Sequence, residues 1–390
     1  MPDRETSTAH HHRRLAFLLA GLSAVGPFST DAYLPSFQEI GRVFAASPVL
    51  VQQTLTAYLV PFALMTLWQG AISDALGRRR VTIAMLALFT GASLGCMLAW
   101  RIEALLFFRA VQGMTAGAGM VIGRAVVRDL LDGAEARRLM SRVALVFAIA
   151  PALGPVVGGW LHVWFGWRSV FAFIALFSAA MCAWCWRALP ETLPAARRRP
   201  LAVGSMARGY REVFSSPPFV ALVVSVTANF SAVFVYIVSA PAFLMQHLRV
   251  SETGFLWLFG SISAGMMAGT WLSGALAGRL SNRRTVAWGY AVMGAAAGAN
   301  VLFHALAPAA LPWSIVPLVA YVVGTSLAMP SLTLIALDLF PSRRGLASSC
   351  QAFVQTSGNA LVTAVVAPAV WGSALTLALG MAGLLAVGAA

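Results

Sequence analysis

The chain has 390 residues, of which 59% are hydrophobic and 10% are charged, whereas a typical soluble domain has about 25% charged residues. Its formal net charge is +14, and all 27 basic residues are arginine. This composition excludes a soluble globule, a collagen, a disulfide scaffold and a disordered chain, and it indicates a membrane protein with several spans.

Twelve apolar segments are long enough to cross a bilayer, whose hydrocarbon core needs about 20 residues per helix. In chain order they are residues 15–37, 49–72, 81–100, 104–127, 141–164, 168–188, 217–245, 253–277, 285–307, 313–337, 345–370 and 372–390. The sequence therefore predicts an all-α membrane protein with twelve transmembrane helices.

The arginines lie in short clusters between these segments. If the N-terminus is placed in the cytoplasm and the spans alternate, 21 arginines fall on the cytoplasmic side and four on the outer side. Positive charge marks the cytoplasmic side of membrane proteins, so both termini are predicted to be cytoplasmic. The same clustering argues against nucleic acid as a partner. Arg109 and Arg124 fall within spans; Arg124 either binds an acidic group or snorkels to the interface.

A polar segment divides the chain between the sixth and seventh spans. It covers residues 189–216, LPETLPAARRRPLAVGSMARGYREVFSS, and has six spans on either side. We predict an N-terminal six-helix bundle over residues 1–188, a cytoplasmic linker over 189–216 and a C-terminal six-helix bundle over 217–390. Residues 201–214 of the linker could form a short amphipathic helix on the membrane surface.

The two halves share a short repeat. GAISDALGRRR at 70–80 matches GALAGRLSNRR at 274–284 in five of eleven positions, and each copy joins the second and third spans of its half. Equivalent placement in two six-span halves argues for duplication, as in transporters built from repeated bundles.

Several motifs resemble those of a known family. GAISDALGRRR resembles the loop signature of the major facilitator superfamily (MFS). ALGPVVGG at 152–159 resembles the antiporter motif of proton-driven drug exporters, and RAVQGMTAGAG at 109–119 is similar to their arginine-bearing helix. STDAYLP at 29–35 and VVRDL at 126–130 resemble the bicyclomycin and chloramphenicol resistance branch (Bcr/CflA). The second-half repeat departs from the signature, with Gly278 and Ser281 in place of Asp74 and Gly77.

Asp31 and Arg109 are the candidate proton-coupling residues. An aspartate at the centre of a spanning helix costs about 2.5–3.5 kcal/mol, so its presence within the first span suggests a function. Arg109 lies at a comparable depth in the fourth span. We expect the two side chains to face a common cavity and to be linked directly or through water. The alternative for Asp31 is a helix-end residue that simply reaches water.

Two sets of residues are candidate gates. In the 70–80 loop, Gly77 permits a sharp turn, and Asp74 can pair with a facing helix end or with an arginine across the bundle interface. In the fifth span, a proline bends the helix and glycines permit close contact across the halves. The alternatives are an ordinary positive-inside anchor and a generic helix kink. The candidate gating residues are Gly70, Asp74, Gly77, Arg78, Arg79, Gly154, Pro155, Gly158 and Gly159.

Polar and aromatic residues within the spans are candidates for substrate binding. Three amides in the eleventh span are spaced by four residues, which places them on one helix face. Aromatic walls with few polar anchors suit lipophilic drug-like compounds. The alternative for each residue is a role in helix packing. The candidates are Tyr58, Gln112, Asn229, Phe230, Phe234, Tyr236, Gln351, Gln355 and Asn359.

Motifs for cofactors and catalysis are not evident. Cys182 and Cys185 form a CxxC, but they lie in an apolar segment without a second ligand pair, so we interpret them as small buried hydrophobes. No GxxxxGK[ST] motif for ATP occurs. His162 and His304 have no acidic neighbour in sequence that would suggest a catalytic pair. We therefore expect no metal, no cofactor and no catalytic residues.

The resemblance and the residues together predict proton-coupled efflux of small lipophilic drug-like compounds by alternating access. The expected location is the bacterial inner membrane, with the chain acting as a monomer. The principal alternative is a transporter of the same family that imports or exports a specific metabolite. A membrane enzyme and a channel are further alternatives. The sequence does not identify the compound that is carried.

Overall fold

A computed structural model describes the backbone of residues 2–130, 133–198, 200–276 and 278–390. Within these ranges, the side chains of residues 2–16, 128, 133–138, 140–148 and 342 are not described. Every regular element in the described part of the chain is an α-helix or a short 3-10 or π-helical segment. The protein is thus all-helical, as the hydropathy pattern predicts.

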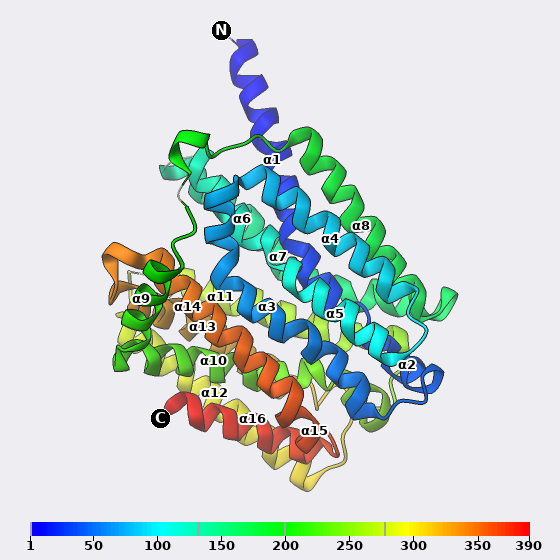
Figure 1. Cartoon of the computed structure of the whole chain (residues 1–390). Coiled ribbons are helices and arrows are strands. Elements are labelled where there is room, and N and C mark those ends of the chain that lie inside the picture. The colour runs from blue at the N-terminus through cyan, green and yellow to red at the C-terminus, as the bar shows by residue number, and fades with distance from the viewer. Residues whose placement is uncertain (1, 131–132, 199, 277) are drawn as a thin grey trace.

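The first half of the chain carries the elements that precede the linker (Figure 1). They are α1 (Pro2–Asp31), η1 (Leu34–Ser36), α2 (Phe37–Val43), α3 (Pro48–Leu76), α4 (Arg78–Met97), α5 (Ile102–Ala116), α6 (Ala118–Leu130), α7 (Gly133–Phe165) and α8 (Trp167–Ala188).

The linker and the second half complete the chain. The linker contains η2 (Ala195–Arg197) and α9 (Val203–Phe214). The second half contains α10 (Pro217–Val238), η3 (Pro241–His247), η4 (Glu252–Phe255), α11 (Leu256–Leu276), α12 (Asn282–Leu306), α13 (Val316–Asp338), η5 (Pro341–Arg343), α14 (Arg344–Leu361), η6 (Val362–Val366), α15 (Ala367–Val370) and α16 (Ala374–Ala389).

Each predicted span coincides with helix, although some boundaries differ. In the described residues, nine helical segments are long and apolar enough to cross a membrane, and Ile149–Phe165 and Ala374–Ala389 are shorter apolar helices. The α-helix at the first span ends at Asp31 rather than at residue 37. Pro35 lacks the backbone N–H that would bond the Asp31 carbonyl four residues earlier, so the α-helical hydrogen bonds cannot continue there. The fourth span is divided at Gly117 into α5 and α6.

Close helix packing depends on glycine at several crossings. Gly113 of α5 lies against the backbone of Tyr58 on α3, and a Cβ at Gly113 would lie 3.0 Å from the Tyr58 Cα and closer still to its carbonyl. In the second half, Gly289 of α12 and Gly324 of α13 face each other. Helices in a membrane associate through close packing of this kind, because lipid tails are as apolar as the side chains.

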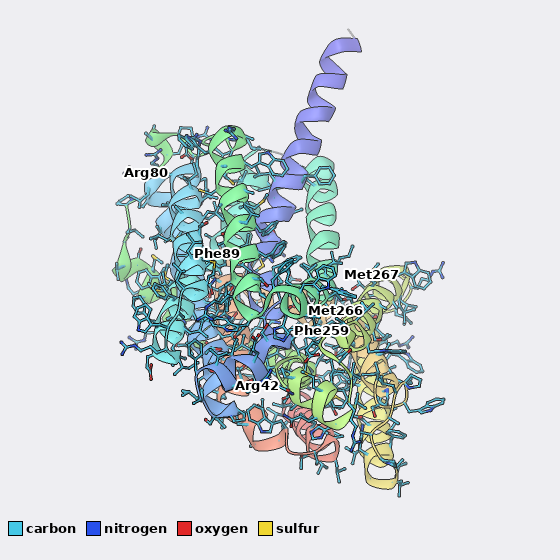
Figure 2. All side chains as sticks on the ribbon, turned by 90° about the vertical axis from the view of Figure 1, so that its right-hand side faces the viewer. Arg42, Arg80, Phe89, Phe259, Met266 and Met267 are labelled. Atoms are coloured by element: carbon cyan, nitrogen blue, oxygen red, sulfur yellow. The ribbon has the colours of Figure 1, made fainter. Side chains whose placement is uncertain are left out.

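The two halves meet through α3 against α14 and through α7 against α11. The side-chain amide of Gln52 donates to the Val238 carbonyl (3.3 Å), and that of Gln53 donates to the Ala364 carbonyl (3.4 Å). These contacts lie where α3 begins and α10 ends, which is the end of the molecule marked by Arg42 in Figure 2. We call it the α3-start end; Arg80 lies at the opposite end of the first half.

The linker helix α9 makes a contact with each half near that opposite end. Val213 is fully buried, and α9 packs against α10 and α14. The phenol of Tyr210 donates a hydrogen bond to the Leu67 carbonyl on α3 (2.6 Å). Burial raises the pKa of Tyr210 to about 12, so the phenol stays protonated and can donate at neutral pH. The linker therefore bridges the halves at this end.

We predict that Gly113→Ala destabilises the protein. The new methyl group would overpack the contact between α5 and α3, which costs about 1–3 kcal/mol and exceeds the helix-propensity gain of up to about 1 kcal/mol. The measurement is thermal unfolding of the purified protein in detergent. Gly91→Ala on α4 is the matched control, because a Cβ there meets nothing within 4 Å. Equal midpoints for the two variants would contradict the packing argument.

Candidate functional site

A central cavity of about 350 Å³ lies between the two halves. Its walls come from α1, α3, α5, α6 and α7 of the first half and from α10, α11, α13 and α14 of the second. Asp31 lines this cavity and is its only carboxylate among the described lining residues, which include no basic side chain. The cavity is therefore largely apolar, with few polar anchors.

Five of the nine predicted substrate-binding residues line the cavity. Tyr58 belongs to the first half, and Phe230 and Phe234 are stacked on α10 with ring centroids 6.0 Å apart. On α14, Gln355 and Asn359 reach the cavity from one helix face. These polar and aromatic groups therefore lie together around one space, and their role in substrate binding stays a prediction.

The other four predicted residues are absent from the cavity lining and have partners elsewhere. Asn229 donates to the Tyr290 hydroxyl (2.7 Å), and Tyr236 accepts from the Asn300 amide (2.8 Å). Gln351 donates to the Thr333 hydroxyl (3.0 Å). The fourth, Gln112, takes part in the network around Arg109. In this conformation these amides and hydroxyls connect helices.

Asp31 is the last residue of α1 and is 8% exposed. The Thr30 hydroxyl donates to its carboxylate (3.0 Å). Gly154 of α7 lies against it, so that a Cβ at Gly154 would come 3.3 Å from the Asp31 Cβ. The helix end and the glycine together leave the carboxylate at the cavity wall.

Arg109 is fully buried in the first half. Its Nη1 donates to the Ser29 carbonyl (2.9 Å) and to Gln112 Oε1 (2.8 Å), and its Nε donates to the Thr54 carbonyl (3.4 Å). The rings of Tyr33 and Tyr58 each lie 4.4 Å from the guanidinium carbon. Aromatic faces attract a desolvated cation in this arrangement, whereas Nη2 has no hydrogen-bond partner.

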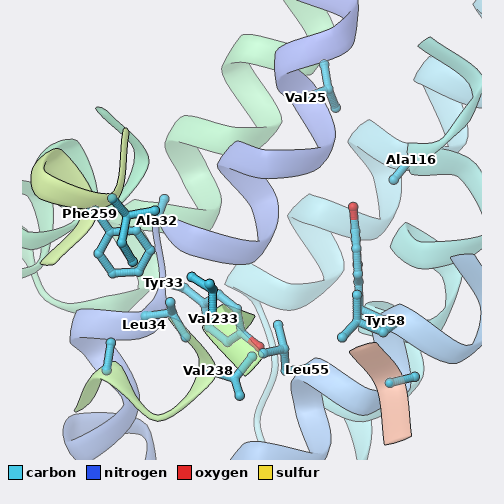
Figure 3. Close-up of a cluster of buried hydrophobic side chains, with 14 of the residues drawn as sticks. Val25, Ala32, Tyr33, Leu34, Leu55, Tyr58, Ala116, Val233, Val238 and Phe259 are labelled. Atoms are coloured by element: carbon cyan, nitrogen blue, oxygen red, sulfur yellow. The ribbon is translucent and has the colours of Figure 1, made fainter. Parts of the chain in front are cut away.

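Asp31 and Arg109 do not form an ion pair with each other in the described part of the chain. Tyr58 lines the cavity that contains Asp31, and its ring also covers Arg109. Figure 3 shows Tyr33 and Tyr58 among the buried apolar side chains around this region. The two charged residues therefore share a bundle, and only Asp31 faces the cavity.

Sequence reasoning missed several residues of the site. The ring of Tyr33, two residues after Asp31, lies over the Arg109 guanidinium. The Ser93 hydroxyl accepts a hydrogen bond from the Gln112 side-chain amide (2.7 Å). The cavity walls also include Met266 and Phe259 of α11 (Figure 2). Tyr33 lies within the STDAYLP motif, so its position beside Asp31 is a usable signal; the others are apolar or small polar residues without a distinctive pattern.

The predicted 70–80 gate forms a charged cluster with the end of α6 and the linker. Arg78 pairs with Asp74 and, through Nε, with Asp129 (3.2 Å). Glu191 accepts from the Arg78 backbone N–H (2.9 Å). Gly77 has φ +100°, a conformation that favours glycine. These partners belong to the first half and the linker.

Of the other two predicted gating residues here, Gly70 lies near Val121 and Arg79 donates to the Trp186 carbonyl (2.5 Å).

The glycines of α7 contact both halves. Gly158 packs on the backbone of Ala32, which follows Asp31. Gly159 packs on the backbone of Glu252 in η4, which belongs to the second half. Pro155 lies inside α7 beside them. The helix is thus held closely against the end of α1 and against the other half.

Comparison with known proteins identifies relatives along most of the chain. Residues 17–363 match the family model of the Major Facilitator Superfamily. The chain is 30% identical to an uncharacterized MFS-type transporter, YdgK, of Bacillus subtilis, over 88% of this chain and 85% of the relative. It is 28% identical to a bicyclomycin resistance protein homolog of Haemophilus influenzae, over 62% and 61%. It is 25% identical to multidrug resistance protein D of Escherichia coli, over 96% and 94%.

The fold is similar to that of a solved transporter. The inward open conformation of the xylose transporter XylE from E. coli superposes with a TM-score of 0.74, covering 96% of this chain and 95% of that one. The sequence identity is 14%, so the likeness concerns the fold alone.

We predict that Arg109→Lys lowers thermal stability. An ammonium cannot stack flat between the two tyrosine rings or reproduce the fork of hydrogen bonds, so we expect a loss of about 1–3 kcal/mol, the range for an unsatisfied buried partner. Thermal unfolding in detergent measures it. The matched control is Arg101→Lys, because the Arg101 side chain is 65% exposed. An Arg109→Lys protein as stable as this control would show that the guanidinium geometry is dispensable.

Proposed function

This chain belongs to the Major Facilitator Superfamily, and from that premise we propose that it exports small lipophilic drug-like compounds in exchange for protons. The observation that carries the proposal is the cavity between the halves, which combines aromatic walls with one buried carboxylate. The relatives named for bicyclomycin and multidrug resistance support this function over transport of a specific metabolite, and they agree with the motifs of the Bcr/CflA branch.

The proposed architecture has twelve spans in two six-helix bundles, residues 1–188 and 217–390, joined by a cytoplasmic linker. The arginine distribution supports placing both termini in the cytoplasm. In this orientation the α3-start end faces outward, and the end with Arg78 and α9 faces the cytoplasm. We propose that the chain acts as a monomer in the bacterial inner membrane.

The proposed transport cycle is alternating access, in which the cavity opens to one side of the membrane at a time. The hydrogen bonds from Gln52 and Gln53 to the second half lie at the outer end, which supports reading this conformation as closed to the outside. The α7 glycines pack tightly at the same end and act as the outer gate. The cluster of Asp74, Arg78 and Asp129 forms the inner gate, by changing its partners when the halves close on the cytoplasmic side.

Asp31 carries the proton in this proposal. A proton arrives from outside when the cavity opens outward, the cargo leaves, and the proton is released inward after the halves rock. Arg109 holds the end of α1 through the Ser29 carbonyl, so it is coupled to the position of the carboxylate. One elementary charge crossing 100 mV gains about 2.3 kcal/mol, which supports a cargo gradient of roughly fiftyfold.

We predict that Asp31→Asn abolishes energised export, because an amide cannot take up and release the coupling proton. The measurement is accumulation of a fluorescent lipophilic drug in cells, with and without an uncoupler. Wild-type cells should accumulate several-fold less drug than variant cells, and the uncoupler should remove the difference. Glu103→Gln, at an exposed acid of the same half, is the control and should export normally. Equal accumulation in all conditions would refute the antiport proposal.

The cargo is predicted to be neutral or singly positive. One carboxylate faces the cavity among its described lining residues, so a second positive charge would lack a partner in a poorly hydrated space. In a set of matched compounds, we expect the neutral and the monocationic members to be exported better than the dicationic member. Transport assays with everted vesicles provide the measurement, and dications as the best cargo would contradict the prediction.

A further inference from the structure

A second cavity lies at the α3-start end, outside the candidate functional site. Its volume is about 510 Å³, which falls within the range of about 300–1,000 Å³ typical of small-molecule pockets. We call it the outer crevice and define it by Arg42, Gln52, Ser239, Gln246 and Trp371, all of which line it. The first two residues belong to the first half and the other three to the second, so its walls come from both halves.

The outer crevice and the central cavity follow one another along two helices. On α3, Gln52 lines the crevice and Tyr58 lines the cavity, with Leu55 between them at 2% exposure. On α10, Val238 lines the crevice and Val233 lines the cavity. Figure 3 shows Leu55, Val233 and Val238 gathered with Tyr33. The two spaces have no lining residue in common among the described residues, so we treat them as separate sites.

The two spaces differ in charge. Among the described lining residues, the central cavity has a carboxylate and no base, whereas the crevice has Arg42 and no carboxylate. Arg42 forms no ion pair with a described side chain. The carboxylate of Glu39, on the same helix, instead lies 3.1 Å from His162 Nδ1 and accepts a hydrogen bond from the Trp167 backbone N–H (3.0 Å). Arg42 is therefore an exposed cation in the lining of the crevice that has no ion-pair partner among the described side chains.

The remaining lining provides donors beside an apolar surface. Ser239 is 1% exposed and its hydroxyl has no hydrogen-bond partner. Gln38 and Gln246 supply exposed side-chain amides. Most of the rest is apolar and includes Trp371. This surface suits a molecule with an apolar body and an acidic, hydrogen-bond-accepting head group.

We propose that the outer crevice binds an amphipathic anion, with the head group at Arg42 and the apolar body against the second half near Trp371. The occupant contacts both halves, so it ties them together at this end. Under the proposed alternating access, such a molecule acts from outside as a brake on opening.

The binding test uses 11-bromoundecanoate, whose bromine quenches nearby tryptophan fluorescence and whose carboxylate supplies the anionic head. Full-length protein is titrated in nanodiscs of phosphatidylcholine. We expect saturable quenching in the wild type and loss of that saturable component in Trp371→Phe. Quenching that does not saturate, or that is identical in Trp371→Phe, would overturn the proposal.

Charge variants test the role of Arg42. Arg42→Gln should weaken binding about tenfold or more, as expected for loss of one charge-assisted contact, and Arg42→Lys should weaken it by less than about threefold. Arg101→Gln is the control, since it removes an exposed arginine of the same end outside the crevice. Equal affinities of Arg42→Gln and Arg101→Gln would refute the assignment.

Two further arms separate the possible sources and the proposed function. In nanodiscs that contain phosphatidylglycerol, weaker apparent binding of the bromo acid identifies a lipid head group as the occupant, and unchanged binding identifies a water-borne amphiphile. Asp31→Asn should bind the bromo acid normally, because its carboxylate lies in the other cavity. Binding at the outer crevice is therefore expected even if the proposed proton coupling fails. Loss of bromo-acid binding in Asp31→Asn would contradict the proposal that the crevice and the central cavity are separate sites.

Discussion

The burial of one guanidinium governs the arrangement of the first half. A guanidinium is a positively charged group, so the burial of Arg109 requires carbonyl oxygens and aromatic faces to replace water. Those groups come from Ser29 and Tyr33 at the end of α1 and from Thr54 and Tyr58 on α3. The end of α1 and part of α3 are thereby held around one side chain on α5. Both helices also line the central cavity, so this contact helps to position the cavity wall.

Hydrogen bonds join the halves at the α3-start end, and the two cavities differ in the charged residue that lines each of them. Amide side chains on α3 reach backbone carbonyls of the second half, and Leu55 lies in the apolar layer between the cavities. Cargo that passes this layer would leave a space with a carboxylate and meet one with Arg42. A cationic compound would be attracted in the first space and repelled in the second.

The sequence predicts elements better than contacts, and the reason is physical. Hydropathy reports the length of an apolar segment directly, so each predicted span coincides with helix. The helical period also places Gln355 and Asn359 together in the cavity. Which polar side chains point away from the cavity depends on hydrogen-bond partners that are distant in sequence. Asn229 is held by Tyr290, 61 residues later, and Arg78 is held by Glu191, which lies in the linker. No local pattern encodes these contacts.

The separation of Asp31 from Arg109 changes how the proposed coupling between them could work. An ion pair would transmit protonation by direct Coulomb attraction, but here a tyrosine ring lies over the guanidinium on the cavity side. The mechanical connection is nevertheless short. Arg109 holds the carbonyl of Ser29 two residues before the carboxylate, and Gly158 of α7 packs on Ala32 just after it. A shift of the α1 end on protonation would therefore act on the buried cation and on the helix that contacts the other half at the same time.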